Sequence, residues 1–277
     1  MREGRRVAVV MGGVSAEREV SLASGDCITR ALSRAGFEVV PVQIHDDGRW
    51  EIADVVREVV PPAPARDWFR GQGDSMLRVV AQLAEECDAV VNGLHGPMGE
   101  DGTIQGLFRI VGVPLSGPAV IPAAVTMDKC LTKNALSDSG IDTPAFFRLD
   151  ELVDDVTGSP IERSPLRDHL GVRADGSIAA AEMQLPFPLP WIAKPRCLGS
   201  SVGVEIFRQP EEFSTWYESH RTTTHEDEAL ETREYFVEQM VDGRELTVAV
   251  IETEGVVRAL PAIEIIPRSR KTLMSEG

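Results

Sequence analysis

The chain has 277 residues, of which 43% are hydrophobic and 26% charged. That length accommodates about two domains of ordinary size. The 44 acidic side chains outnumber the 28 basic ones and give a net charge of −16. This balance argues against broad binding to nucleic acid or to an anionic membrane, because both need a basic face. An anionic small-molecule ligand would have to be held by a few placed cations.

Lysine is scarce in this arginine-rich chain. The four lysines are Lys129, Lys133, Lys194 and Lys271. Such a bias indicates that a lysine is kept where a compact, rotatable ammonium is needed instead of a planar guanidinium. The four cysteines are scattered without metal-ligand spacing, which indicates reduced thiols. With no signal-peptide pattern and no run of 18 apolar residues, the sequence predicts a cytoplasmic protein without a membrane span.

The first part of the chain alternates between strand and helix patterns. An apolar run over residues 6–11, ended by Gly12 and Gly13, predicts a buried parallel strand. Further strands are predicted at 37–44, 87–96 and 113–117, and a helix that begins at residue 103 closes at Gly112. The helix after the first strand ends at Gly36, and its spacing predicts one buried face, formed by Val20, Ala23, Cys27 and Ala31. Repeated strand–helix units predict a parallel sheet covered on both faces.

The pattern changes after residue 126. A helix is predicted over 127–139, ending at Gly140, and residues 150–190 form an irregular insertion of weak periodicity. Strand-like runs then follow one another directly, with Glu254 and Gly255 as a hairpin turn. Strand next to strand predicts a second domain of the α+β type. We therefore expect domains at 1–125 and 126–245, and the start of a third at 246–277.

The stretch after the first strand has the pattern G-G-x-S-x-E. Glycines and a helix start directly after a buried strand favour an anion or polar ligand, because unpaired amides and the helix dipole point there. The local alternative is that Ser15 caps the helix while Glu17 and Glu19 complement its dipole. These residues alone leave both interpretations open.

A second glycine-rich stretch, residues 93–106, follows a later strand and contains His95, Glu100 and Asp101. It lies where open parallel sheets place their ligands. We expect Asp101 to be the N-cap of the next helix, whereas His95 suits a hydrogen bond to an anion.

Two further segments carry charge inside apolar strands. In residues 191–204, a strand that contains Lys194 is followed by a turn at Gly199, Ser200 and Ser201. Such a turn beside a lysine predicts a phosphate-binding loop. The alternative is a plain hairpin turn without a ligand. Glu238 interrupts an apolar strand and Glu245 begins the next one. A buried carboxylate needs a partner, which a ligand or a neighbouring Arg244 could supply.

Together these segments resemble the D-alanine–D-alanine ligase family of the ATP-grasp superfamily. The shared motifs occur in the family's order: G-G-x-S-x-E-x-x-V-S, H-G-x-x-G-E-D-G-T-x-Q-G, M-D-K, K-P-x-x-x-G-S-S-V-G and E-x-x-x-x-G-x-E-x-T-V-x-V. The resemblance covers most of residues 6–266. It implies an N-terminal parallel-sheet domain of the Rossmann-like, pre-ATP-grasp type, followed by an α+β ATP-grasp domain.

The resemblance implies a role for each matched residue. Glu17 would hold the ammonium of the first D-alanine with Ser21 nearby, Ser200 would orient Glu17, and His95 would lie near the reacting carboxylate. The implied ATP contacts are Lys129, Lys194 and Ser201 for the phosphates, Glu238 for the adenine amino group and Glu245 for the ribose. The implied reaction activates one D-alanine as an acyl phosphate, which the amine of a second D-alanine attacks, for peptidoglycan synthesis. The implied partners are these small molecules, and a homodimer is compatible with the resemblance.

The resemblance weakens after residue 265. Family members continue into a mobile loop with a Tyr and into a domain whose acidic pair binds Mg²⁺, whereas the printed sequence ends in PRSRKTLMSEG. We therefore expect the Mg²⁺ ligands to lie outside these residues. Two alternatives stay open: an inactive, truncated nucleotide-binding remnant, and a ligase that uses D-lactate or D-serine as its second substrate.

Overall fold

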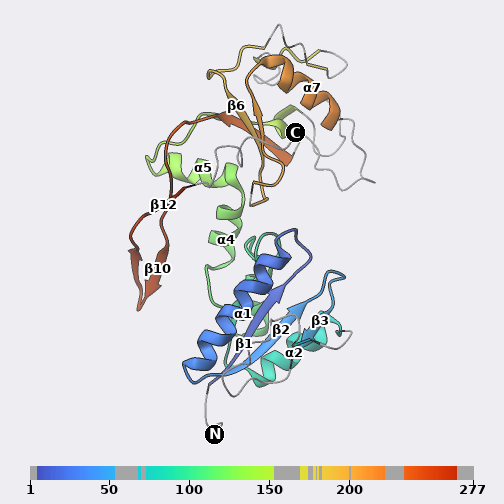
Figure 1. Cartoon of the computed structure of the whole chain (residues 1–277), viewed down its shortest axis with the longest axis vertical. Coiled ribbons are helices and arrows are strands. Elements are labelled where there is room, and N and C mark those ends of the chain that lie inside the picture. The colour runs from blue at the N-terminus through green and yellow to red at the C-terminus, as the bar shows by residue number, and fades with distance from the viewer. Residues whose placement is uncertain are drawn as a thin grey trace.

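The computed structural model describes residues 5–53, 68–69, 73–152, 169–173, 177–178, 180, 183–199, 201–221 and 234–266. Its first sheet has the strand order β3-β2-β1-β4 (Figure 1). The strands are β1 (Arg6–Gly12), β2 (Glu38–Ile44), β3 (Trp50–Ile52) and β4 (Ala89–Asn92). β1 pairs in parallel with β2 and β4, which confirms the predicted parallel core, and the edge strand β3, not predicted, is antiparallel.

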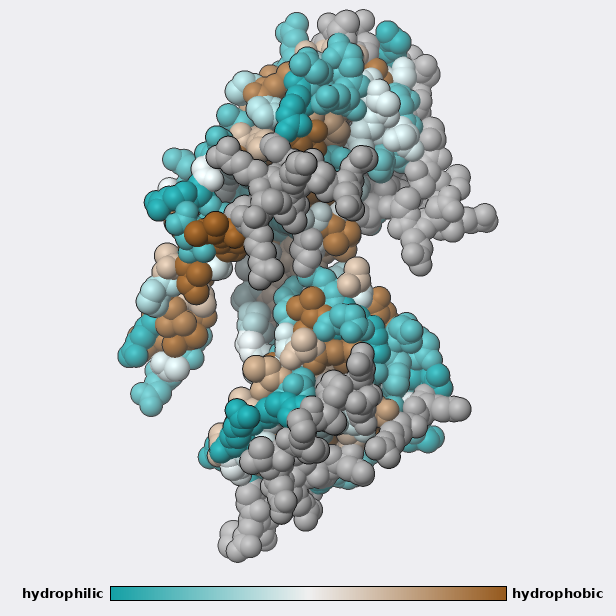
Figure 2. All heavy atoms as spheres, viewed as in Figure 1, coloured by the Kyte–Doolittle hydropathy of each residue, from teal (hydrophilic) through white to brown (hydrophobic). Residues whose placement is uncertain are grey.

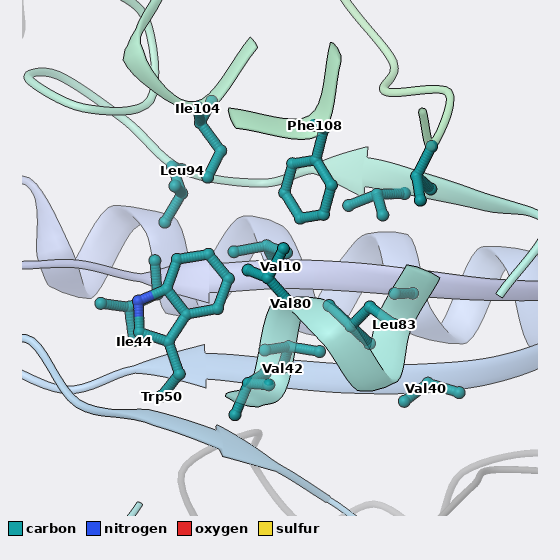
Figure 3. Close-up of a cluster of buried hydrophobic side chains, with 14 residues drawn as sticks. Val10, Val40, Val42, Ile44, Trp50, Val80, Leu83, Leu94, Ile104 and Phe108 are labelled. Atoms are coloured by element: carbon teal, nitrogen blue, oxygen red, sulfur yellow. The ribbon is translucent and has the colours of Figure 1, made fainter. Parts of the chain in front are cut away.

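Helices cover both faces of this sheet, as predicted. α1 (Arg18–Arg34) packs on one face, where Leu22 joins β1 and β2 residues in a buried cluster. α2 (Met76–Glu86) and α3 (Thr103–Val111) cover the other face. Figure 3 shows Phe108 and Leu83 from these helices packed against Val10 and Val42 of the sheet. The two clusters fix the carboxyl ends of β1 and β4 beside each other.

The predicted buried face of α1 is wrong, although the helix itself is confirmed. Val20 is 52% exposed, and Ala23, Cys27 and Ala31 are exposed as well. The buried residues are instead Ser21, Leu22, Gly25 and Thr29. Small and polar side chains allow this helix to approach the sheet closely, so close approach outweighs the apolar pattern.

The caps of these helices differ from expectation in detail. α3 ends at Gly112, which is left-handed at φ 77°, as predicted. Its N-cap position is Gly102 instead of Asp101. The Asp101 carboxylate nevertheless accepts from the amide of Thr103, the first residue of the helix, and from that of Met98 in the preceding loop. Ser15 does not cap α1, because the N-cap position is occupied by Glu17 and no side chain caps it.

The helical segment around residue 130 is divided in two. α4 (Val120–Met127) and α5 (Lys129–Asp138) meet at Asp128, whose extended backbone interrupts the helix. The Asp128 carboxylate caps α5 by accepting from the amides of Cys130 and Leu131 at 2.8 and 3.1 Å.

The second sheet has the order β5-β8-β6-β7 and is antiparallel at each pairing. It contains β5 (Phe146–Arg148), β6 (Trp191–Pro195), β7 (Glu205–Phe207) and β8 (Tyr235–Gln239), and the 3-10 turn η2 (Leu149–Leu152) follows β5. α7 (Pro210–Arg221) packs on it through an aromatic cluster that includes Phe207, Phe213 and Trp216. This is the predicted α+β region. Most of the predicted insertion at 150–190 lies outside the described residues.

The last described strands form a projecting ribbon (Figure 1). β9 (Glu245–Thr247) pairs with β12 (Ile263–Ile265), and β10 (Val250–Thr253) pairs with β11 (Val256–Ala259) through the predicted turn at Glu254 and Gly255. Apolar side chains cover much of it in Figure 2. We propose domain boundaries near residues 125 and 245. Among the described residues, no helix combines the length and apolarity required to cross a bilayer.

Candidate functional site

The Glu17 carboxylate lies between two glycine-containing loops that are distant in sequence. A Cβ atom at Gly96 would lie 2.5 Å from Glu17 Oε2, and one at Gly199 would lie 3.1 Å from Oε1. Gly96 follows β4 and has a φ of 70°, whereas Gly199 belongs to the loop after β6. Both glycines therefore provide room for this carboxylate, and it links the first sheet to the second.

His95 is oriented by α1 and by the loop before it. Its Nε2 atom lies 2.9 Å from Ser24 Oγ, and its carbonyl accepts a 3.0 Å hydrogen bond from Ser15 Oγ. On the other side of the ring, Nδ1 lies 4.0 Å from Glu100 Oε1. Ser15 thus positions His95, which is a different role from the capping role considered above.

Beside His95 is a cavity of about 650 Å³ with both polar and apolar side chains in its lining. Ser24, His95 and Glu100 line it, together with Asn92, Gln105 and Ser116. The cavity opens at the carboxyl end of β4, where parallel sheets commonly bind ligands. Its size suits a small polar molecule.

Ser21 does not reach this surface. The side chain is fully buried, and its hydroxyl accepts from the Gly12 amide at 2.8 Å and donates to the Gly93 carbonyl at 2.7 Å. These bonds join the loops that follow β1 and β4 to α1. The structure therefore places Ser21 behind the expected substrate site instead of in it.

Lys129, at the start of α5, holds the loop that follows β6. Its ammonium donates to the carbonyls of Pro195 at 3.2 Å, Arg196 at 3.4 Å and Leu198. Burial lowers the pKa of Lys129 below its usual value. Lys129 is partly buried, and its three hydrogen bonds go to carbonyls, so binding a phosphate would require it to exchange at least one of these contacts.

Glu238 is paired with two lysines instead of Arg244. Its Oε2 lies 2.6 Å from Lys133 Nζ and its Oε1 lies 2.5 Å from Lys194 Nζ. Lys194 comes from the neighbouring strand β6, and Lys133 comes from α5. Lys133 was not predicted to belong to the site. The scarcity of lysine in the chain was the signal that could have identified it.

The other expected residues lie on exposed segments. Ser201 has a left-handed backbone with a φ of 60° in the turn between β6 and β7, and Glu245 begins β9. Gly203 closes the same turn, and a Cβ there would meet the Tyr235 hydroxyl at 2.8 Å, so the backbone approaches this tyrosine closely. Ser200 lies outside the described residues.

The loop over residues 196–199 joins the two halves of the candidate site. It meets Glu17 at Gly199 and Lys129 at Leu198, and β6 delivers Lys194 to its start. Arg196 in this loop pairs with Asp128 at 2.6 Å and with Asp150 at 2.7 Å, which anchors the loop to α5 and η2. This short segment thus connects Glu17, at the start of α1, to Lys129 of α5 and Lys194 of β6.

The part of the chain that the structure describes offers no group of three or more His, Cys, Asp or Glu side chains arranged to hold a metal ion. These residues therefore do not fit the Mg²⁺ that the sequence resemblance implies, and no step is assigned to a metal here.

Two family models match the chain. The model described as "D-ala D-ala ligase N-terminus" matches residues 6–118, and "D-ala D-ala ligase C-terminus" matches residues 167–273. The D-alanine–D-alanine ligase of Deinococcus radiodurans is 37% identical over 75% of this chain, and that of Desulforudis audaxviator is 32% identical over 96%. The chain spans 54% and 67% of the length of these two curated relatives.

Solved structures share the fold. The D-alanine-D-alanine ligase from Coxiella burnetii matches with a TM-score of 0.64 and 24% identity, covering 95% of this chain and 71% of that one. The VanG D-Ala:D-Ser ligase from Enterococcus faecalis matches with a TM-score of 0.66 and 22% identity, covering 95% and 70%. These matches support the predicted α/β fold class, with one sheet that contains parallel strands and further antiparallel sheets. The chain belongs to the D-alanine–D-alanine ligase family.

Proposed function

We propose that this chain carries the nucleotide site and the first amino-acid site of a D-alanine–D-alanine ligase. The observation that supports this most directly is the loop over residues 196–199. At Gly199 it adjoins Glu17, which suits an ammonium group, and at Leu198 it contacts Lys129, which suits a phosphate, while Lys194 lies in the strand that leads into it. An enzyme that phosphorylates an amino acid's carboxylate needs these two kinds of group side by side.

The reaction begins with transfer of the terminal phosphoryl group of ATP to the carboxylate of one D-alanine, giving an acyl phosphate and ADP. The amine of a second D-alanine then attacks the acyl carbon, the new C–N bond forms, the C–O bond to phosphate breaks, and inorganic phosphate leaves. Glu17 holds the ammonium of the first D-alanine, and His95, fixed by Ser24, donates a hydrogen bond toward its carboxylate. The Ser21 hydroxyl bonds the backbone at Gly12 and at Gly93 and so holds the loops that follow β1 and β4.

Lys129 and Lys194 neutralise the phosphates, with Ser200 and Ser201 in the covering loop. Two ammonium groups are well suited to phosphate oxygens, because each rotates freely around its own axis. Glu238 accepts from the adenine amino group and Glu245 from the ribose hydroxyls. Mg²⁺, which the sequence resemblance implies, would help to neutralise phosphate charge if residues outside the described ones hold it.

The test uses the neighbouring carboxylates Glu17 and Glu19, of which Glu19 is exposed. Glu17→Gln should weaken D-alanine binding at least about tenfold, because the charge that meets the ammonium is lost, while ATP binding changes less than about twofold. Glu19→Gln should leave both unchanged. Calorimetric titration with ATP, and then with D-alanine, measures binding without requiring turnover.

ADP release on adding D-alanine to the ATP-loaded protein separates the ligase from a nucleotide-binding remnant. Mass spectrometry of the product formed with D-alanine plus D-lactate or D-serine identifies the second substrate. A protein that binds no adenine nucleotide, or in which the two Gln variants behave alike, contradicts the proposed site.

A further inference from the structure

The three lysines of the described residues gather at one face of the second sheet. Lys129 and Lys133 come from α5, and Lys194 comes from β6. The protein carries a net charge of −16, so a local cluster of cations stands out from its surroundings. Lys129 and Lys194 have family roles in phosphate binding, whereas Lys133 has none in the function proposed above.

Lys133 occupies the inner side of the Glu238 carboxylate. Its side chain is 9% exposed, and its ammonium lies 2.6 Å from Glu238 Oε2 and 5.0 Å from the centre of the Phe146 ring. Phe146 of β5 is the direct partner of Glu238 in the sheet. The ammonium is therefore enclosed by a carboxylate, an aromatic ring and its own helix, a setting that favours a permanent contact.

Lys194 occupies the outer side of the same carboxylate. Its side chain is 29% exposed and its ammonium lies 2.5 Å from Glu238 Oε1. One cation is enough to neutralise one carboxylate, so the cluster of Lys133, Lys194 and Glu238 carries one surplus positive charge. The more exposed lysine is the one that can leave without stranding a buried charge.

We propose that Lys133 is a positioning residue for nucleotide recognition. It neutralises Glu238 and fixes its orientation, so that Lys194 moves from Glu238 Oε1 to a phosphate when the nucleotide binds. The same movement frees Oε1 to accept a hydrogen bond from the base. Lys133 acts only through Glu238 and does not touch the nucleotide. This inference rests on the proposed function, because it concerns the same nucleotide site.

The arrangement couples phosphate binding to choice of base. Adenine offers an amino group to the freed Oε1, whereas guanine presents a carbonyl oxygen at the same ring position, which a carboxylate disfavours. Without Lys133, Glu238 would keep Lys194 as its only neutralising partner. Both the phosphate contact and the base contact would then weaken together.

The experiment measures the dissociation constants of ADP and GDP by calorimetry for the wild type, Lys133→Met, Glu238→Gln and the double variant. Lys133→Met should weaken ADP binding roughly ten- to a hundredfold, as expected for loss of a charged contact, and should reduce the preference for ADP over GDP. The double variant should bind ADP within about twofold of Glu238→Gln, because Lys133 has no further role once Glu238 is neutral. Arg78→Met, an exposed cation of α2 paired with Asp74, is the matched control and should change neither constant.

Three results would overturn the inference. The first is an unchanged preference for ADP over GDP in Lys133→Met. The second is a double variant that binds ADP ten times more weakly than Glu238→Gln, which would mean that Lys133 contacts the nucleotide itself. The third, a wild type that binds neither nucleotide, removes the proposed function together with the inference. If Lys133→Met alone does not fold, as judged by circular dichroism, the comparison of Glu238→Gln with the double variant decides the question, since neither contains the Glu238 carboxylate that loses its buried partner.

Discussion

The Ser21 hydroxyl donates a 2.7 Å hydrogen bond to the Gly93 carbonyl and joins α1 to the end of β4. The same oxygen accepts from the Gly12 amide at the end of β1. Two neighbouring elements, β1 and α1, thus meet the distant strand β4 at one fully buried side chain. The loops that carry Glu17 and His95 are held together behind the site by this hydroxyl.

Replacing Ser21 with Ala should lower the free energy of unfolding by about 1–3 kcal/mol, because the Gly12 amide and the Gly93 carbonyl both lose a buried partner. Urea denaturation measures the change. Ser139→Ala is the control, since its exposed hydroxyl bonds only the Ala135 carbonyl one turn earlier, and should change stability by less than about 0.5 kcal/mol. Equal effects of the two substitutions would contradict the bridging role of Ser21.

The close approach of α1 to β1 makes Gly25 intolerant of a side chain. A Cβ atom there would lie 2.5 Å from Met11 Cβ and 2.7 Å from Met11 Sδ. Gly25→Ala should destabilise the protein by about 1–3 kcal/mol despite the higher helix propensity of alanine. Thermal unfolding followed by circular dichroism measures this effect.

Gly106, in α3, provides the matched control. A Cβ there would meet only Val120 Cγ2, at 4.0 Å. Gly106→Ala should therefore stabilise the protein by about 0.5–1 kcal/mol through helix propensity alone. A stabilising Gly25→Ala would show that α1 does not pack against Met11 as closely as described.

Asp128 should contribute to stability in a pH-dependent way. Burial alone would raise the pKa of Asp128, but the Arg196 guanidinium and the amides of Leu131 and Cys130 outweigh it and hold the pKa below its usual value of 3.8. A carboxylate with a lowered folded-state pKa stabilises fully above its unfolded pKa and loses this contribution as the pH falls through the folded value.

Asp128→Asn keeps an acceptor for the helix cap and removes the charge that meets Arg196. It should cost about 1–3 kcal/mol at pH 7, and the difference from the wild type should shrink as the pH falls below about 4. Urea midpoints measured at several pH values test this. A difference that stays constant from pH 7 to pH 2 would mean that the charge pair with Arg196 is not its source.

The four cysteines should differ in reactivity according to their surroundings. Cys130 is buried, and burial raises the pKa of its thiol to about 12, so a maleimide should label it only after unfolding. Cys27 and Cys197 are exposed and should be labelled in the folded protein. ADP should slow the labelling of Cys197, which lies in the loop beside Lys129, and leave Cys27 unaffected. Peptide mapping by mass spectrometry distinguishes these sites, and equal slowing at both cysteines would place the nucleotide elsewhere.

The prediction of α1 shows how far the sequence alone could go. Its helix was predictable, because the spacing and Gly36 are local signals. Its buried face was not, because the apolar positions Val20, Ala23, Cys27 and Ala31 face outward. The face that packs on the sheet contains Gly25, whose small size matters only once Met11 lies opposite. A periodicity argument has no access to the shape of the facing surface.

In the candidate site, too, some features were predictable from the sequence and others were not. The motifs identified Lys194 as a cation beside a phosphate-binding turn and Glu238 as a carboxylate inside an apolar strand, and the cost of burying charge required a partner for Glu238. The sequence did not identify the partner of Glu238, and Arg244 was the nearest candidate along the chain. Strand pairing of β6 with β8 and the position of α5 instead bring Lys194 and Lys133 to Glu238.

The order of the elements, the two kinds of sheet and the types of residue at the site follow from hydrophobic period, glycine position and buried charge, which are local properties of the chain. Long-range packing is what places Ser21 behind the site, gives Glu17 its room beside Gly199 and lets Lys133 share Glu238 with Lys194. Each of these contacts joins elements far apart in the sequence. Their geometry depends on how the sheets and helices pack, which no local pattern encodes.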